Sequence, residues 1–388
     1  MENQIKSICV VSEGYPYADD YRFSFVSQLC EEFSRHNVTV YVISPQSILH
    51  ILLKKEKKHP LYRKETYGGA DLHVYRPYFL LAPHKFRIFN DASFKYAVSR
   101  QFRKIKDRIK VCYGHFWNCA YYISEEAKKN NIPLFVASGE GNFDKYKDYY
   151  TSEKFLNFSK DVKGAICVST HCKEFSVRYG LISDENCIVL PNSIDNNLFY
   201  PRDKKSLRKH YGIDEKYFIV MFIGSFINRK GSDRLSNAIE SLNRRGLDIK
   251  SFFIGEGQGS ENLMPTCDGI LHCGPLEHSK VPDFLNMADV FVLPTLNEGC
   301  SNAIIEAMAC GLPIISADRP FNHDILNKTN SILINPIDEE EIADAIRQVY
   351  NDVKLRKKLS YGVIKTAEKL TIKQRAKSIL EFISEKQC

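Results

Sequence analysis

Two glutamates stand in a polar loop and in the helical pattern that follows it. Glu298 comes after an apolar run that ends at Pro294, and Glu306 lies within a helix expected from about Asn302 to Gly311. Apolar residues surround Glu306, so we expect this helix to be buried. A buried carboxylate is costly unless donors satisfy it, and sugar hydroxyls would do so. Backbone amides could satisfy it as well, which leaves a structural role open.

A second loop carries two adjacent cations. Arg229 and Lys230 precede Gly231, after the expected strand Phe218 to Ile223 and before a helix for which Ser232 is the expected N-cap. Two positive charges beside a helix N-terminus suit a diphosphate whose charge is neutralised without a metal. Such a pair is also common on solvated surfaces. The loop lacks the spacing of an ATP-type phosphate loop.

One histidine holds a comparable position in the first half of the chain. His115 ends the apolar run from Val111 and precedes a helix-like stretch. A lone histidine is more often structural than catalytic, but reactive residues gather where parallel strands end. The segment Ser138 to Asn142 ends another apolar strand on the same expected side. It could shape a sugar-acceptor pocket or form an ordinary loop.

The elements around these residues follow a strand, loop, helix, strand order twice. The order starts at the apolar run Ile8 to Val11 and again at Tyr217, with a turn-rich linker at Val189 to Pro201 between the two halves. This pattern is typical of α/β units with parallel sheets. We expect two such domains, over residues 1–195 and 196–370, and a final helix over 371–388 that packs on the first domain.

Composition excludes several classes of protein. With 44% hydrophobic and 26% charged residues among 388, the chain has an ordinary globular composition. No apolar run approaches the roughly 20 residues needed to cross a bilayer, and the N-terminus lacks the features of a secretory signal. The twelve cysteines include no C-x-x-C pair, so we expect reduced thiols and no metal site.

The net charge of +7 comes from one segment. Residues 50–110 hold 16 basic and 5 acidic side chains, whereas the remainder holds 38 basic and 42 acidic ones. Within it, Lys54 to Lys58 and Arg100 to Lys110 are interleaved with aliphatic and aromatic residues. Such a surface could meet anionic lipid, phosphate-bearing substrates or nucleic acid, or be only a solvated face. The negative remainder offers no continuous track for nucleic acid.

Taken together, these motifs resemble the retaining glycosyltransferases of family 4. The run from Glu298 to Pro313 is similar to that family's E-x7-E signature, Leu190 to Asp195 to its interdomain passage, and Gly224 to Gly231 to its phosphate loop. The resemblance implies a GT-B fold, in which two Rossmann-like domains face each other across a cleft. It departs from many relatives at Ser225, where they have arginine, and at Gly14, where they have two glycines.

The resemblance also implies roles for the site residues. Glu298 and His115 would act near the reaction centre, and Glu306 would bind the ribose of a nucleotide sugar. The expected donor-binding residues are Arg229, Lys230, Glu306, Gly14 and the segment of Gly299, Cys300, Ser301 and Asn302. Transfer would proceed with retention, and the departing diphosphate would help to deprotonate the acceptor. No metal or other cofactor is expected, because no D-x-D triplet is present.

We therefore expect a hexosyltransferase that uses a UDP- or GDP-sugar and a saccharide acceptor on a lipid carrier, in surface polysaccharide synthesis. Its expected place is the cytoplasm, with the basic segment at the anionic inner face of the membrane. Alternatives are a sugar-nucleotide epimerase or phosphorylase of the same fold and a non-catalytic nucleotide-sugar-binding protein. A nucleic-acid partner is not expected.

Overall fold

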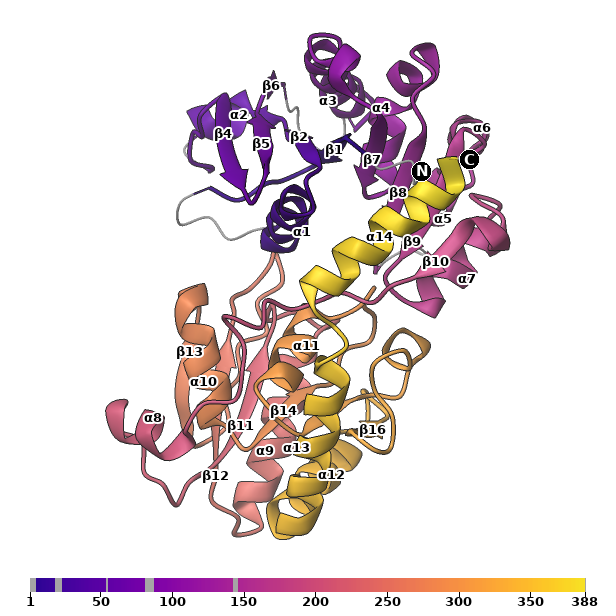
Figure 1. Ribbon diagram of the computed structural model, residues 1–388. Coiled ribbons are helices and arrows are strands. Elements are labelled where there is room, and N and C mark those ends of the chain that lie inside the picture. Colours follow the sequence, from indigo (N-terminus) through magenta and orange to yellow (C-terminus); the bar gives the residue numbers. More distant parts are fainter. Residues whose placement is uncertain (1–4, 18–22, 54, 81–86, 142–145, 388) are drawn as a thin grey trace. The chain divides into compact units, whose positions relative to one another are not determined.

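The computed structural model describes residues 5–17, 23–53, 55–80, 87–141 and 146–387. The chain forms two compact units (Figure 1). The N-terminal unit comprises residues 1–190 and 372–388, and the C-terminal unit comprises residues 191–371. The linker expected over 189–201 thus belongs mostly to the C-terminal unit, where Ile194 forms a parallel bridge with Thr371.

The N-terminal unit is built on an eight-stranded sheet in the order β10-β9-β8-β7-β1-β2-β5-β4. All its pairs are parallel except β4 with β5. Its strands are β1 (Ser7–Ser12), β2 (Thr39–Ile43), β4 (Tyr62–Tyr67), β5 (Ala70–Tyr75), β7 (Val111–His115), β8 (Leu134–Ser138), β9 (Val162–Cys167) and β10 (Cys187–Val189). A separate pair joins β3 (Gln46–Ser47) to β6 (Tyr78–Phe79).

The helices of this unit cover its sheet. They are α1 (Ser24–Arg35), α2 (Ile48–Leu52), α3 (Arg87–Phe102), α4 (Trp117–Lys129), α5 (Lys147–Tyr150), α6 (Glu153–Ser159), α7 (Thr170–Arg178) and α14 (Ile372–Gln387). In α1, Val26, Leu29 and Phe33 share one helical face and are buried in the core. Figure 1 shows α14 beside α1 and β9, and its Ile379 and Ile383 are fully buried in the same core.

The C-terminal unit has a six-stranded parallel sheet in the order β13-β12-β11-β14-β15-β16. Its strands are β11 (Phe218–Ile223), β12 (Ile249–Ile254), β13 (Ile270–Gly274), β14 (Val290–Leu293), β15 (Ile314–Ala317) and β16 (Ser331–Ile334). Its helices are α8 (Lys204–His210), α9 (Ser232–Arg244), α10 (Val281–Met287), α11 (Asn302–Ala309), α12 (Glu339–Asn351) and α13 (Val353–Ala367). The near-continuous apolar strands β11 and β14 lie at its centre, as expected for a sheet covered on both faces.

Two sequence expectations need correction within this frame. The N-cap of α9 is Gly231, not Ser232, because Gly231 adopts a left-handed conformation (φ +77°) just before the helix. Several apolar residues of the basic segment, including Phe94, Phe102 and Ile105, are buried in the core and are not part of an exposed surface.

The described residues contain no membrane-spanning helix, no disulfide and no cluster of metal ligands. No described helix is both long and apolar enough to span a bilayer. The described cysteines, Cys9 to Cys310, are all free thiols. Within the same ranges, no group of three His, Cys, Asp or Glu side chains is arranged to hold a metal ion.

Candidate active site

The two motif loops of the C-terminal unit follow neighbouring strands of one sheet. β11 pairs in parallel with β14, and Val220 aligns with Val290. The loop of Arg229 and Lys230 leaves β11, and the loop of Glu298 leaves β14, so both lie at the carboxyl edge of the sheet. In open α/β sheets this edge is where ligands bind.

Glu298 joins the two loops through its carboxylate. Its Oε1 accepts hydrogen bonds from Lys230 Nζ at 2.5 Å, Thr295 Oγ1 at 2.9 Å and Arg229 Nη1 at 3.3 Å. The Arg229 guanidinium also donates to the carbonyl of Asn297 at 2.7 Å. Both cations are thus paired with the acid that follows β14, and the three side chains together carry a net charge of +1. Thr295 is fully buried, and no sequence pattern predicted that it would belong to this group.

The approach of these loops depends on Gly231. A Cβ atom at this position would lie 2.7 Å from the carbonyl oxygen of Pro294, and the positive φ is strained for other residues. The amide of Leu296 donates to the carbonyl of Arg229 at 2.8 Å, which fixes the two loops together. Glycine therefore permits the contact that places Lys230 beside Glu298.

Glu306 lies in the middle of α11, and its carboxylate has no hydrogen-bond partner among the described residues, whereas its backbone carbonyl accepts a hydrogen bond from the amide of Cys310. Burial raises the pKa of its carboxyl group to about 7. The structural alternative, a carboxylate satisfied by backbone amides, is therefore not what the side chain does here. A half-buried carboxyl group without protein donors in the described residues is suited to accept hydrogen bonds from a ligand's hydroxyl groups.

The segment before α11 presents backbone groups beside Glu298. Its members Cys300 and Ser301 are buried, and Ser301 is the N-cap residue but makes no side-chain capping bond. The carbonyl of Cys300 accepts a hydrogen bond from Asn192 Nδ2 at 3.0 Å. Gly299 and Asn302 complete the segment, and the helix dipole at this end favours a negative or electron-rich group.

His115 is the last residue of β7, aligned with Ser12 of β1 and Ala137 of β8. It is buried, and its Nδ1 atom has no hydrogen-bond partner in the part of the chain that the structure describes. Burial, with the nearby positive charge of Arg375, lowers the pKa of its imidazole to about 3. The ring is therefore neutral near pH 7. In this form it can accept or donate one hydrogen bond, but it carries no charge.

Glu140 lies at the same edge of the N-terminal sheet as His115. No sequence pattern predicted a role for its side chain. The two carboxylate oxygens of Glu140 accept hydrogen bonds from the backbone amides of Trp117 at 2.9 Å and Gly139 at 3.0 Å. Burial nevertheless raises the pKa of Glu140 to about 7, with Glu13 adding to the shift. Nearby, the carbonyl of Gly14 accepts a hydrogen bond from Ser12 Oγ at 2.7 Å, which fixes the loop after β1. Asn142 lies outside the described residues.

The basic segment is only partly available for a partner. Arg103 is bonded to Glu126 at 2.6 Å, and Lys106 to Asp107 at 3.1 Å. Exposed leucines, Leu52 (74% exposed) and Leu53 (55%), lie at the end of α2, directly before Lys55 and its neighbours. Lys54 lies outside the described residues. Exposed leucines and lysines thus lie next to each other at this end of α2.

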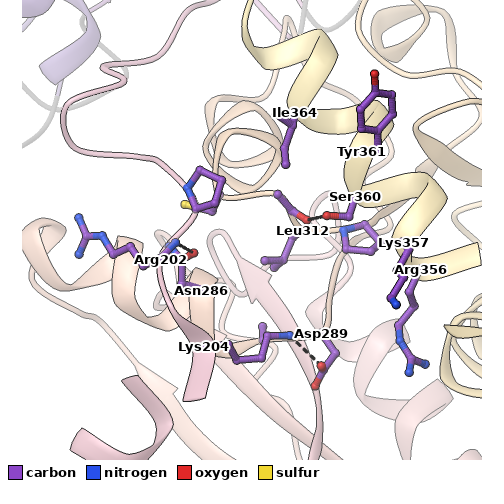
Figure 2. A pocket seen from close by; sticks show the side chains of 15 residues that line it. Arg202, Lys204, Asn286, Asp289, Leu312, Arg356, Lys357, Ser360, Tyr361 and Ile364 are labelled. Atoms are coloured by element: carbon purple, nitrogen blue, oxygen red, sulfur yellow. Dashed lines mark hydrogen bonds and ion pairs between the residues drawn. The ribbon is translucent and has the colours of Figure 1, made fainter. Parts of the chain in front are cut away.

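A pocket of about 450 Å³ lies elsewhere in the C-terminal unit (Figure 2). It is lined by residues that precede β14 and β15, such as Asp289 and Pro313, and by α13, so it lies at the amino edge of the sheet. Its Lys204 is paired with Asp289 at 2.8 Å, as Figure 2 shows, and Arg356 donates to the carbonyls of Val349 and Tyr350. The pocket is therefore separate from the motif loops.

Comparisons with known proteins agree with this geometry. The model of the glycosyl transferases group 1 matches residues 203–366. A Bacillus subtilis (strain 168) protein named as the teichuronic acid biosynthesis glycosyltransferase TuaC is 26% identical over 328 residues, which cover 81% of this chain and 82% of that protein. The capsular polysaccharide biosynthesis glycosyltransferase CapM of Staphylococcus aureus is 26% identical over 236 residues, covering 58% of this chain and 61% of its own.

Solved structures share the fold over almost the whole chain. Sucrose-phosphate synthase from Thermosynechococcus elongatus superposes with a TM-score of 0.80 at 17% identity and covers 98% of both chains. Anabaena HepE in complex with UDP has a TM-score of 0.73 at 14% identity, and the match covers 98% of this chain and 100% of that chain.

The fold and the matched domain define the chain as a glycosyltransferase of the GT-B class. The region matched by the group 1 glycosyl transferases contains both motif loops, Arg229 to Gly231 and Glu298 to Glu306. The expectation of a GT-B transferase is thereby confirmed.

Proposed function

We propose that the protein transfers a hexose from a UDP- or GDP-sugar to a saccharide acceptor, carried by a lipid, in the synthesis of a surface polysaccharide. The observation that carries this proposal is the joined pair of loops at the carboxyl edge of the C-terminal sheet, where Arg229, Lys230 and Glu298 are in contact. Relatives named for teichuronic acid and capsular polysaccharide synthesis support the polymer as product.

In the proposed reaction, the diphosphate of the donor takes Arg229 and Lys230 as its counter-ions. The two cations offset the negative charge that develops on the leaving group, which stabilises the transition state. Glu306 binds the ribose hydroxyls, and the segment from Gly299 to Asn302 binds the sugar through its amides and the helix dipole. No metal is needed in this scheme, because the two side chains and the helix provide the positive charge.

Glu298 is released from the cations when the diphosphate binds, and it then contacts the transferred sugar. The proposed stereochemical outcome is retention, in which the departing diphosphate takes the proton of the acceptor hydroxyl. His115, neutral at pH 7, hydrogen-bonds to the sugar, and Gly14 contributes its backbone to the donor phosphates. These roles follow the resemblance to family 4 glycosyltransferases.

The acceptor side of the proposal concerns the N-terminal unit. The exposed leucines Leu52 and Leu53, with the lysines Lys55, Lys57 and Lys58, would hold the enzyme at an anionic membrane surface on the cytoplasmic side. A lipid-linked acceptor would be encountered there. The protein would be a peripheral membrane enzyme of the cytoplasm.

The test is a screen of nucleotide sugars with the full chain. Release of the nucleoside diphosphate and formation of a glycosylated product are measured with and without EDTA, and we expect EDTA to have no effect. Binding of a donor without any turnover, with a suitable acceptor present, would favour the alternative of a non-catalytic binding protein. Interconversion of the donor sugar without release of the diphosphate would favour an epimerase.

A further inference from the structure

A buried arginine at the carboxyl edge of the N-terminal sheet lacks partners for most of its donors. Arg76 follows β5 directly and is 1% exposed. Its Nη2 atom donates to the carbonyls of Pro16 at 3.0 Å and Tyr15 at 3.4 Å. Its Nε and Nη1 atoms, which carry three N–H groups, have no hydrogen-bond partner in the described part of the chain.

Two other buried arginines in the described residues have partners for all of their nitrogens. Arg208 is 3% exposed, and its guanidinium donates to three carbonyls and to the carboxylate of Asp289. Arg234 is 8% exposed and has a partner for each of its three nitrogens. Buried polar groups are nearly always bonded, so the unfilled donors of Arg76 require an explanation.

The surroundings of Arg76 are aromatic and include a second arginine, which is paired with an acid. Its guanidinium lies 5.7 Å from the ring centre of Tyr15 and 5.6 Å from that of Tyr17. The guanidinium of Arg63 lies 5.3 Å from the same Tyr17 ring and is paired with Glu65 at 3.1 Å. Burial, together with the charge of Arg63, lowers the pKa of Arg76 to about 10, so the group is still a cation near pH 7.

The backbone holds this cation in place. The amide of Arg76 donates to the carbonyl of Leu61 at 2.9 Å, and its carbonyl accepts from Gln46 Nε2 at 3.2 Å. Tyr15 and Tyr17 belong to the loop after β1, the same loop that contains Gly14. The cation is thus fixed at the edge of the sheet where β1 and β5 end, on the side proposed for the acceptor.

We propose that Arg76 is an anion-binding residue of the acceptor site, which takes a phosphate or carboxylate group of the acceptor. The assignment of the anion to the acceptor rests on the proposed function, whereas the binding of an anion by Arg76 does not depend on it. A planar guanidinium with free N–H groups binds either oxyanion through charge-assisted hydrogen bonds. The half-buried ring of Tyr17 covers the guanidinium and turns away when the anion enters. Phosphate would come from a lipid carrier, and carboxylate from an acidic sugar.

The test measures anion binding by the full chain without any need for turnover. Titration calorimetry with inorganic phosphate and, separately, with glucuronate is performed on Lys230→Ala, in which phosphate binding at the donor loops is weakened. The same titrations on Lys230→Ala with Arg76→Met should show a loss of affinity of roughly tenfold or more for at least one anion. The anion with the larger loss identifies the source.

Stability provides the second measurement. In buffer without either anion, Arg76→Met should melt at the wild-type temperature or above it, since it removes a buried cation whose Nε and Nη1 atoms lack partners in the described residues. Arg76→Lys keeps the charge but loses the planar fork, and it should bind the preferred anion more weakly than wild type.

Equal binding with and without Arg76, no binding of either anion to Lys230→Ala, or unfolding of Arg76→Met would each overturn the proposal. If binding depends on Arg76 but no nucleotide sugar is turned over, the anion site stands and the proposed transferase reaction fails.

Discussion

The Nζ atom of Lys230 lies 2.5 Å from Oε1 of Glu298. The acid after β14 is therefore paired with the lysine of the loop after β11, which is a candidate for binding the anionic part of a ligand. Arg229 shares the same oxygen at 3.3 Å. A diphosphate that binds these cations must compete with Glu298 or displace it. The ion pairs therefore hold the two loops in register before the donor arrives, at some cost in donor affinity.

This relationship gives opposite expectations for binding and for turnover in Glu298→Gln. Inorganic pyrophosphate should bind about threefold to tenfold more tightly, because the cations lose their internal counter-ion. Transfer should fall by about 100-fold or more, because the carboxylate proposed to contact the sugar is gone. Calorimetry and a product assay measure the two effects.

The matched control is Glu277→Gln, which breaks the exposed ion pair of Glu277 with Lys280 in the same unit and should leave both measurements unchanged. Weaker pyrophosphate binding by Glu298→Gln would show instead that the acid positions the cations for the ligand.

The raised pKa of Glu306 leads us to expect that a proton is released when a nucleotide sugar binds. Its pKa of about 7 lies above the ordinary value of 4.5, so at pH 6.5 more than half of the ligand-free protein carries the proton. Ribose hydroxyls that donate to the carboxylate favour its charged form and lower that pKa. Binding of UDP-glucose or GDP-mannose at pH 6.5 should therefore release roughly half a proton or more, and almost none at pH 8.5.

Calorimetry in buffers of different ionisation enthalpy measures this release. Glu306→Gln should abolish it, and Glu140→Gln, which removes the other carboxyl group with a pKa of about 7, should keep it. The nearby thiol of Cys310, whose pKa is raised to about 12, stays protonated throughout. Proton uptake on binding, or release that persists in Glu306→Gln, would assign the titration to another group.

The raised pKa of Glu306 also has a consequence for stability. The folded protein binds this proton more tightly than the unfolded chain does, so its contribution is favourable at pH 4.5 and is lost as the pH rises to about 7. In Glu306→Gln, the fall in stability over this pH interval should be smaller than in the wild type. Urea denaturation at pH 5 and pH 8 measures the difference.

Local patterns in the sequence were sufficient to predict the strands and helices around the motifs. The apolar run Phe218 to Ile223 is β11, and the final helix expected over 371–388 is α14 (Ile372–Gln387). The helix α13 was not predicted, because Gly362 interrupts its pattern. A Cβ atom at Gly362 would lie 2.3 Å from the carbonyl of Thr329, so this glycine serves packing within a helix.

The contacts of the site could be predicted only in part. The spacing of Glu298 and Glu306 indicated a sugar site, but nothing local showed that Glu298 would neutralise Lys230, 68 positions earlier. Arg76 had no signal either, since its burial depends on Tyr15 and Tyr17, which come from a loop some 60 positions away. Such pairings arise from the order of strands in the sheet, which hydrophobic periodicity does not specify.

Membrane binding is predicted to depend on the end of α2. The leucines Leu52 and Leu53 are exposed beside Lys55, Lys57 and Lys58. Each lysine near an anionic surface contributes about 1 kcal/mol, so changing all three to Glu should weaken binding to anionic vesicles by roughly 100-fold or more. Co-sedimentation with vesicles that contain phosphatidylserine measures this effect, and added salt should reduce the binding of wild type.

Lys205→Glu with Lys209→Glu, in α8 of the C-terminal unit, is the matched control and should bind as wild type does. Equal binding to neutral and anionic vesicles, or binding that salt does not change, would contradict an electrostatic contact.

The stability of the C-terminal unit is predicted to depend on Arg208. Its Nε and Nη2 atoms donate to the carbonyl of Met287 at 2.9 and 2.7 Å, and Nη2 also donates to Asp289 Oδ2 at 2.8 Å. Arg208→Met would leave Asp289 with fewer partners and several carbonyls without a donor. Breaking a buried ion pair from one side costs about 3–5 kcal/mol, so urea denaturation should show a loss of this size.

We expect the stability of Arg208→Met to differ from that of Arg76→Met. Both variants remove a buried guanidinium, but only Arg208 has its donors filled by the protein, so only Arg208→Met should lose stability. Lys205→Met, which removes an exposed ion pair with Glu215 at 3.7 Å, should change the free energy of unfolding by less than about 1 kcal/mol. If Arg208→Met were as stable as the wild type, hydrogen bonds to a buried guanidinium would not be what stabilises this fold, and the contrast with Arg76 would lose its meaning.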